Sequence, residues 1–258
     1  MGIAVDGKNY DLVMFDLDDT LAPSKSPMSE EMAALLRRLL GHTAACIISG
    51  GRYEQFEMQV LARLGRFDDI ARFHLMPTCG TQYVRWNGDD WETVYAENLT
   101  DDQKYRALKV LEIGAKELGL WSEQTWGPIL EDRGSQITFS ALGQSAPVAE
   151  KSQWDPENTK KEKLRAYAAE RLPDLEVRSG GSTSVDITVK GIDKAYGTRK
   201  LIDILGIGPE QILFFGDRLD PGGNDYPVKE MGIDSVHVAD HDDTFRRLTA
   251  ILDAQPAT

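Results

Sequence analysis

The chain has 258 residues, 41% of them hydrophobic and 28% charged, which is typical of a globular protein with one large or two medium domains. Its formal net charge of −13 argues against binding to nucleic acid or to anionic membranes, since both require a basic surface. No apolar run could span a bilayer, and the first residues do not form a signal-peptide pattern. The two cysteines, Cys46 and Cys79, have no metal-binding spacing. We therefore expect a cytoplasmic protein.

The N-terminal residues alternate between short apolar runs and amphipathic stretches. They predict a strand, a helix, a strand and a helix, over residues 12–15, 29–39, 44–48 and 53–64. This alternation is typical of an α/β fold with a Rossmann-like, doubly wound parallel sheet.

The pattern changes near residue 80 and returns near residue 191. Between them we expect a hairpin, a helix, strands, a polar connection, a helix and strands, over 83–95, 101–118, 129–140, 143–158, 159–171 and 175–189. Helices and strands alternate again over 194–205, 212–215, 235–238 and 242–252. We therefore predict an α/β core at 1–83 and 190–258, interrupted by an α+β domain at 84–189.

Carboxylates and a hydroxyl follow the first predicted strand directly, as Asp16, Asp18, Asp19 and Thr20. Because side chains alternate along an extended chain, Asp16 and Asp18 can face one pocket. Two such carboxylates repel each other unless a cation neutralises them, and Mg²⁺ prefers oxygen ligands of this kind. The alternative is an acidic turn that merely ends a strand, because Asp is common in turns.

Polar residues also follow the other predicted core strands. Ser49 and Gly50 follow the second strand, and Asp217 follows the strand at 212–215. Lys194 begins the helix that precedes that strand. A carboxylate nucleophile, a metal held by carboxylates, and cationic and hydroxyl groups are the parts that phosphoryl transfer requires. Each motif is weak alone, but the ordered set predicts a phosphoryl-transfer enzyme.

This ordered set resembles the haloacid dehalogenase superfamily of phosphatases and phosphomutases, and the inserted domain is similar to a type IIB cap. The closer resemblance, over nearly the whole chain, is to the eukaryotic-type phosphomannomutases. The segments that carry it are Gly191-Ile-Asp-Lys194, Pro221-Gly-Gly-Asn-Asp225 and Gly180-Gly-Ser-Thr-Ser184-Val-Asp186. The resemblance implies a catalytic core and a cap that determines substrate specificity.

The resemblance also implies catalytic roles. Asp16 would attack the phosphoryl group and carry it as an aspartyl-phosphate. Asp18 would protonate the leaving oxygen and then activate the water or hydroxyl that resolves this intermediate. Ser49 and Lys194 would hold the phosphoryl oxygens, and Lys194 would also separate the carboxylates.

The cofactor implied by the resemblance is Mg²⁺. Its ligands would be Asp16, the backbone carbonyl of Asp18, Asp217 and Asp225. Residues that would bind the substrate lie in both parts of the chain: Thr20, Lys25, Gly50, Arg133, Ser184 and Asp186. The substrate would be a small phosphorylated sugar, and a homodimer through the cap is a family expectation.

Several positions depart from the mutase pattern. Gln144 and Lys151 stand where mutases carry further cap arginines, and Lys25 replaces an arginine in the loop after the first motif. Cys79 stands where an Asn is usual. Because Lys is a weaker phosphate clamp than Arg and Gln has no charge, we expect a Mg²⁺-dependent sugar or polyol phosphatase. The alternative is a phosphohexomutase that moves phosphate between C6 and C1 of a hexose.

Overall fold

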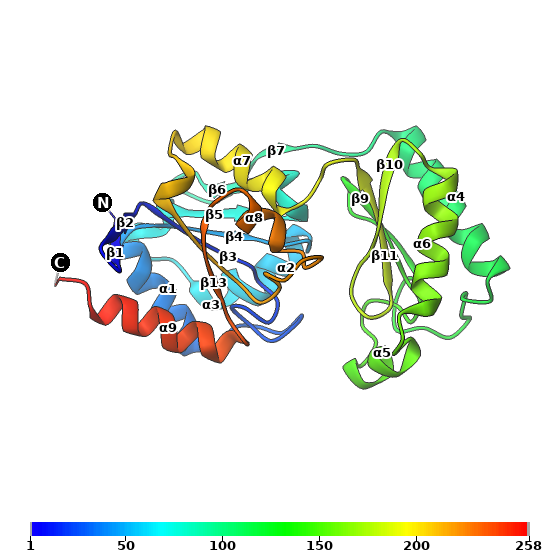
Figure 1. Ribbon diagram of the computed structural model, residues 1–258, viewed down its shortest axis with the longest axis horizontal. Coiled ribbons are helices and arrows are strands. Elements are labelled where there is room, and N and C mark those ends of the chain that lie inside the picture. Colours follow the sequence, from blue (N-terminus) through cyan, green and yellow to red (C-terminus); the bar gives the residue numbers. More distant parts are fainter. Residues whose placement is uncertain (1, 257–258) are drawn as a thin grey trace. The chain divides into compact units, whose positions relative to one another are not determined.

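The computed structural model describes residues 2–256. Its contacts divide the chain into two compact units (Figure 1). The core unit comprises Met1–Ala96 and Asp193–Thr258, and the inserted unit comprises Glu97–Ile192. Among the described residues, no helix combines the length and apolar character needed to cross a membrane.

A seven-stranded sheet organises the core unit within residues 2–256, in the order β13-β12-β3-β4-β5-β6-β7. Its strands are β3 (Leu12–Phe15), β4 (Ala44–Ile48), β5 (Phe73–Met76), β6 (Gln82–Trp86), β7 (Trp91–Ala96), β12 (Ile212–Gly216) and β13 (Asp234–His237). Neighbours from β13 to β5 pair in parallel, whereas β6 and β7 are antiparallel. The predicted Rossmann-like parallel sheet is confirmed.

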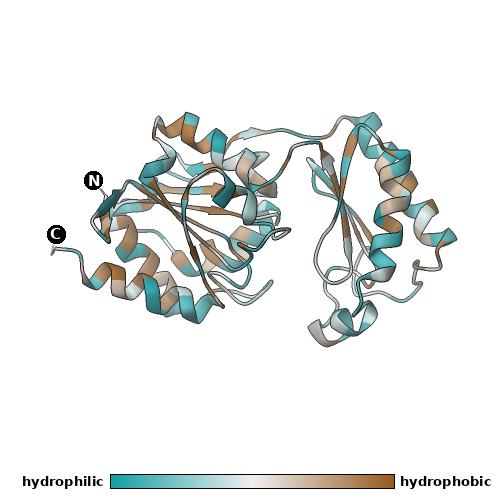
Figure 2. Ribbon diagram, in the orientation of Figure 1, coloured by the Kyte–Doolittle hydropathy of each residue, from teal (hydrophilic) through white to brown (hydrophobic). Residues whose placement is uncertain are grey.

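Helices bury both faces of this sheet. They are α1 (Glu30–His42), α2 (Tyr53–Phe56), the π-helix η1 (Glu57–Leu61), α3 (Ala62–Leu64), α7 (Lys194–Leu205), α8 (Tyr226–Glu230) and α9 (His241–Asp253). Val13 and Phe15 of β3 pack in one core cluster, and Leu12 and Met14 pack in another. This alternation explains the continuous apolar run, since both sides of a central parallel strand are covered. Figure 2 shows hydrophobic residues concentrated in these central strands.

Shorter elements complete the core unit. The strands β1 (Ile3–Val5) and β2 (Lys8–Tyr10) form an antiparallel hairpin. Single 3₁₀ turns occur at η2 (Asp68–Arg72), η3 (Thr78–Gly80) and η4 (Pro209–Gln211). The sequence analysis predicted neither the first hairpin nor β5, because three- and four-residue strands give little periodicity.

The predicted boundary at 83/84 lies too early. The expected hairpin is present as β6 and β7, but β6 pairs with β5 and so extends the core sheet. The core unit therefore continues to Ala96 and resumes at Asp193 rather than at residue 190. Sheet pairing is a long-range property, and the change of local pattern near residue 80 did not reveal it.

The inserted unit has a four-stranded antiparallel sheet, in the order β10-β11-β9-β8, within the described residues. Its elements are α4 (Asp101–Glu117), β8 (Leu130–Asp132), β9 (Gln136–Ser140), α5 (Val148–Trp154), α6 (Thr159–Arg171), β10 (Leu175–Ser179) and β11 (Ser184–Val189). Helices α4 and α6 share an apolar core with one face of the sheet. The predicted α+β arrangement is thus present, with α5 lying inside the stretch expected to be a polar connection.

Candidate active site

Three polar side chains lie at one edge of the core sheet. Asp16 follows β3, Ser49 follows β4 and Asp217 follows β12. Because β12, β3 and β4 are adjacent and parallel, their carboxyl ends meet at that edge. This is where open α/β sheets bind their ligands.

Lys194 lies between two buried carboxylates. Asp193 caps the start of α7 through a hydrogen bond from the Tyr196 N–H, which places Lys194 in the first turn. The Lys194 Nζ donates to Asp16 Oδ1 and, at 2.5 Å, to Asp225 Oδ1. All three side chains are at most 5% exposed. Water therefore does little to screen their charges.

Burial is the main influence on proton affinity in this cluster. It raises the pKa of Asp16, the Lys194 ammonium opposes the rise, and the Asp225 charge adds to it, for a value of about 7. Burial and then Asp225 also raise the pKa of Asp217. For Lys194 burial lowers the pKa, but the charges of Asp16 and Asp225 outweigh it and raise the pKa. One ammonium thus faces three carboxylates.

The three carboxylates are close enough to share a cation. One oxygen from each of Asp16, Asp217 and Asp225 lies within 4.8 Å of the other two. Gly216 permits this approach, since an added Cβ there would lie 2.7 Å from Cγ of Asp225. An oxygen-only set with excess negative charge fits a hard divalent cation such as Mg²⁺. The predicted carboxylate ligands are brought together, whereas the side chain of Asp18 is not part of this cluster.

The carboxylate of Asp18 is instead held by two glutamines that the sequence analysis missed. Gln55 Nε2 donates to Asp18 Oδ2 at 2.9 Å, and Gln59 Nε2 donates to Oδ1 at 3.1 Å. The backbone N–H of Lys25 also donates to Oδ1, at 2.8 Å. The available signal was the i, i+4 spacing of two amides on the helix that follows Ser49.

The remaining predicted core residues surround the same strand ends. Ser49 is buried, and its Oγ accepts a hydrogen bond from the Gly51 N–H at 3.1 Å. An added Cβ at Gly50 would meet nothing within 4 Å, so a ligand can approach this backbone. Thr20 is wholly buried, and its Oγ1 has no hydrogen-bond partner among residues 2–256. Lys25 lies in an exposed turn with a φ of 54°.

A left-handed turn at residues 78–80 is hydrogen-bonded to the loop that contains Ser49. The N–H of Cys79 donates to the Ser49 carbonyl and that of Thr78 donates to the Gly51 carbonyl, both at 2.8 Å. Thr78, Cys79 and Gly80 all have positive φ angles. An Asn would suit this conformation better than Cys79, which explains the pattern noted in the sequence.

A polar face of the inserted unit's sheet holds the other predicted residues. Ser184 and Asp186 lie on β11 opposite Ser140 and Thr138 of β9. Thr138 Oγ1 donates to Asp186 Oδ1 at 2.7 Å, and the hydroxyls of Ser140 and Ser184 lie 3.3 Å apart. The intervening Val185 belongs to the apolar core. Ser184 and Asp186 therefore share one face, as their alternation predicted.

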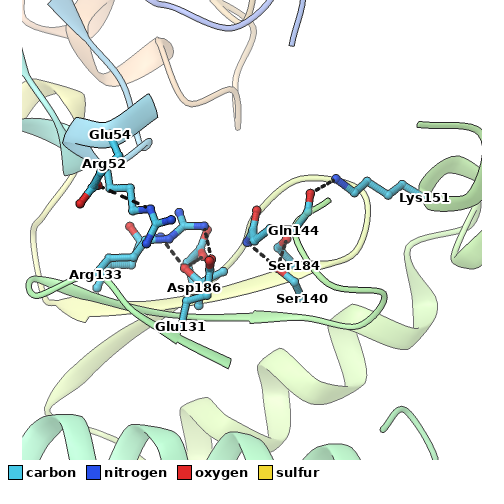
Figure 3. A network of polar contacts seen from close by, with 11 residues as sticks. Arg52, Glu54, Glu131, Arg133, Ser140, Gln144, Lys151, Ser184 and Asp186 are labelled. Carbon is cyan, nitrogen blue, oxygen red and sulfur yellow. Dashed lines mark hydrogen bonds and ion pairs between the residues drawn. The ribbon is translucent and has the colours of Figure 1, made fainter. Parts of the chain in front are cut away.

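Arg133, Gln144 and Lys151 are already bound by their own unit (Figure 3). Arg133 Nη2 pairs with Glu131 at 2.9 Å, while its buried Nε has no partner among the described residues. Gln144 Nε2 donates to Ser140 Oγ at 2.6 Å, and Lys151 Nζ donates to the Gln144 carbonyl at 2.7 Å. This face therefore combines one acid-paired arginine and the Asp186 carboxylate with neutral hydrogen-bonding groups.

The fold and the residues at the strand ends define an enzyme of the haloacid dehalogenase superfamily. The chain is similar to a haloacid dehalogenase-like hydrolase from Bacteroides thetaiotaomicron, with a TM-score of 0.64, 17% identity and coverage of 94% of this chain and 99% of that one. It is also similar to an Aspergillus fumigatus trehalose-6-phosphate phosphatase, with a TM-score of 0.57, 18% identity and coverage of 95% and 93%. At these identities the likeness concerns the fold.

Sequence similarity gives the family. Residues 117–254 match the model of the eukaryotic phosphomannomutase family, and the chain belongs to this family. It is 29% identical over 258 residues to phosphomannomutase from Saccharomyces cerevisiae, covering 93% of this chain and 94% of that protein. It is 26% identical over 255 residues to mouse phosphomannomutase 1, with coverage of 88% and 87%.

Proposed function

We propose that the protein is a phosphohexomutase that moves a phosphoryl group between C6 and C1 of a hexose. The observation that carries this proposal is that the similarity to phosphomannomutases extends across both units. The matched family segment includes β8 to β11. This is the part of the chain in which Gln144 and Lys151 stand where mutases carry arginines. The relatives thus favour the mutase, which the sequence analysis ranked second, over the phosphatase that it ranked first.

The core unit would perform two opposite phosphoryl transfers. In the first, a carboxylate oxygen of Asp16 bonds to phosphorus, the bond from phosphorus to the sugar oxygen breaks, and Asp18 gives that oxygen a proton. In the second, Asp18 takes the proton of the other sugar hydroxyl, whose oxygen attacks phosphorus and releases Asp16. Ser49 and Lys194 would hold the phosphoryl oxygens in both steps.

A bound Mg²⁺ would supply positive charge to the transferring phosphoryl group. Asp16, Asp217 and Asp225 would hold it, together with the backbone carbonyl of Asp18. The support is the clustering of three carboxylates around a single lysine. Asp16 needs such compensation, because its raised pKa would leave part of it protonated, and only the carboxylate is a nucleophile.

The inserted unit would bind the sugar and its non-reacting phosphate through Arg133, Ser184 and Asp186. Thr20, Lys25 and Gly50 would contribute from the core unit. Arg133 suits a phosphate because its planar guanidinium can donate two parallel hydrogen bonds. A homodimer through the inserted unit and a cytoplasmic location remain predictions.

One observation favours hydrolysis as a second candidate activity. Gln144 offers an uncharged amide beside Ser140, and Lys151 is bonded to the Gln144 carbonyl. A mutase must retain a doubly phosphorylated sugar through a reorientation, which takes cations. If the intermediate leaves too soon, water resolves the aspartyl-phosphate and the enzyme is a phosphatase.

A single assay separates the two activities. The purified protein is incubated with Mg²⁺ and mannose or glucose 1-phosphate, with and without glucose 1,6-bisphosphate, while hexose 6-phosphate and free phosphate are both measured. Bisphosphate-stimulated conversion that exceeds phosphate release supports the mutase. Phosphate release without conversion would replace it with the phosphatase, and absence of both would reject phosphoryl transfer from sugars.

A further inference from the structure

The carboxylate of Asp18 is fixed from both of its oxygens. Gln55 binds Oδ2, while Gln59 and the Lys25 N–H bind Oδ1. A single donor would leave the carboxylate free to rotate about its Cβ–Cγ bond. Donors on opposite oxygens set both the rotation and the tilt of the group, so the direction of a proton transfer is set as well.

Gln59 is built into the fold more firmly than a surface amide. It is wholly buried, and its Nε2 also donates to the Ser26 carbonyl at 2.9 Å. Its backbone carbonyl accepts a hydrogen bond from the Met28 N–H, also at 2.9 Å. One residue therefore ties Asp18 to the loop that carries Lys25. Gln59 lies in the π-helix η1, a rare conformation that occurs frequently at functional sites.

Gln55 reaches Asp18 by crossing the loop after Ser49. An added Cβ at Gly51 would lie 2.7 Å from the Gln55 Cδ and closer still to its Oε1. The missing side chain at Gly51 thus provides the space through which Gln55 extends. Gly51 does not have a positive φ, so its backbone would accept an alanine.

We propose that Gln55 and Gln59 are positioning residues that orient Asp18 for proton transfer to and from the sugar oxygen. The inference rests on the proposed function, in which Asp18 is the acid and base. Neither glutamine needs to touch the substrate. General acid catalysis contributes about 10²–10⁴-fold, and a misplaced group forfeits much of it, so loss of one glutamine should cost up to about 10²-fold.

The leaving group provides a test that a purely structural role would not pass. A sugar alkoxide is a poor leaving group and needs the proton from Asp18, whereas p-nitrophenolate leaves without one. Phosphorylation of Asp16 is measured in a single turnover, with glucose 1,6-bisphosphate or p-nitrophenyl phosphate as donor. In Gln55→Leu and Gln59→Leu we expect the rate from the bisphosphate to fall about 30- to 100-fold, and the rate from p-nitrophenyl phosphate to change less than about threefold.

Two further variants keep the result independent of folding. Gly51→Ala removes no polar group but displaces Gln55. It should therefore lower the ratio of the rate from the bisphosphate to the rate from p-nitrophenyl phosphate, as the glutamine variants do. Gln211→Leu is the matched control, since Gln211 bonds to the carboxylate of Asp11, outside the site. It should leave the ratio unchanged. If Gln59→Leu does not fold, Gln55→Leu and Gly51→Ala decide.

Equal losses with both donors, or no loss with either, would overturn the positioning role. Failure of the proposed function looks different, because it shows in the wild-type protein. A phosphatase would form the phosphoenzyme but release phosphate without converting the hexose 1-phosphate, and a protein without phosphoryl transfer would accept a phosphoryl group from neither donor. A change confined to the bisphosphate affinity, with an unchanged maximal rate, would also count against the inference, because it would place the glutamines in substrate binding.

Discussion

The two units handle polar groups in opposite ways. In the core unit Asp16, Lys194 and Asp225 are enclosed, and the Lys194 ammonium compensates only part of the carboxylates' charge. In the inserted unit, Ser184 and Asp186 are half-buried on a sheet face that is rich in hydroxyls and amides. A buried charge cluster tolerates no single loss, because the partner left behind becomes an uncompensated charge. A half-buried face of mostly uncharged groups can change one residue at a time, which suits a surface that selects substrates.

The largest effect should come from the enclosed cluster. Asp16→Asn removes the nucleophilic oxygen while keeping the shape of the side chain. We expect turnover of any phosphate ester to fall by at least about 10⁴-fold, measured as phosphoenzyme formation and as hexose 6-phosphate production. Asp19→Asn is the matched control, because Asp19 is exposed and its φ of 60° suits Asn. Comparable activity in both variants would reject Asp16 as nucleophile.

Low pH should destabilise the core unit in particular, because that unit contains a buried histidine. All 4 histidines lie in the core unit, and His74 is only 7% exposed, with its Nδ1 2.8 Å from the Tyr83 hydroxyl. Burial, and then Arg85, lowers the pKa of His74 to about 4 from 6.5. Between these pH values the unfolded chain binds a proton that the folded chain does not. His74 therefore costs the wild-type protein up to about 3 kcal/mol of stability as the pH falls from 6.5 to 4.

Comparing wild type with a His74 variant separates the contribution of His74 from that of other titrating groups. The stability of wild type minus that of His74→Phe should decrease by about that amount over the same pH range, in urea unfolding. Tyr83→Phe removes the same hydrogen bond but keeps the His74 ring. The stability difference between wild type and Tyr83→Phe should therefore not change with pH. A constant difference for His74→Phe would show that the buried ring does not govern acid stability.

Adding a positive charge to the polar face of the inserted unit's sheet should strengthen phosphate binding there. Gln144→Arg places a guanidinium beside Ser140, where a phosphate could accept two hydrogen bonds. We expect about tenfold tighter binding of glucose 1,6-bisphosphate, and more isomerisation per phosphate released. Gln124→Arg adds the same charge at an exposed position of that unit and should do neither. If both variants bind the bisphosphate equally more tightly, the gain comes from the net charge of the protein and not from the position of residue 144.

The smallest effect should be a gain of stability in the core unit. Cys79 has φ 56° and ψ 31°, a left-handed conformation that costs most residues about 1 kcal/mol and that Asn accepts. Cys79→Asn should therefore raise the free energy of unfolding by up to about 1 kcal/mol, measured in urea. Cys79→Ala retains the strain and should show no gain. Hydrogen exchange should locate the improvement in the core unit alone.

The sequence by itself determined which side chains lie at the strand ends. Apolar runs that stop at Asp16, Ser49 and Asp217 are local signals, and parallel strands bring their carboxyl ends to one edge of a sheet. Alternation along an extended chain likewise predicted that Ser184 and Asp186 share one face. These inferences succeeded because the period of a strand is a property of the backbone.

Only the tertiary structure decided how those groups are held. The hairpin β6–β7 joins the core sheet through pairing with β5, which no local pattern specifies. Gln55 and Gln59 lie far along the chain from Asp18, and Arg133 pairs with an acid of its own unit. Hydrogen bonds of this kind depend on where helices pack against strand ends. A sequence names the groups that can react, but packing determines the direction in which each one points.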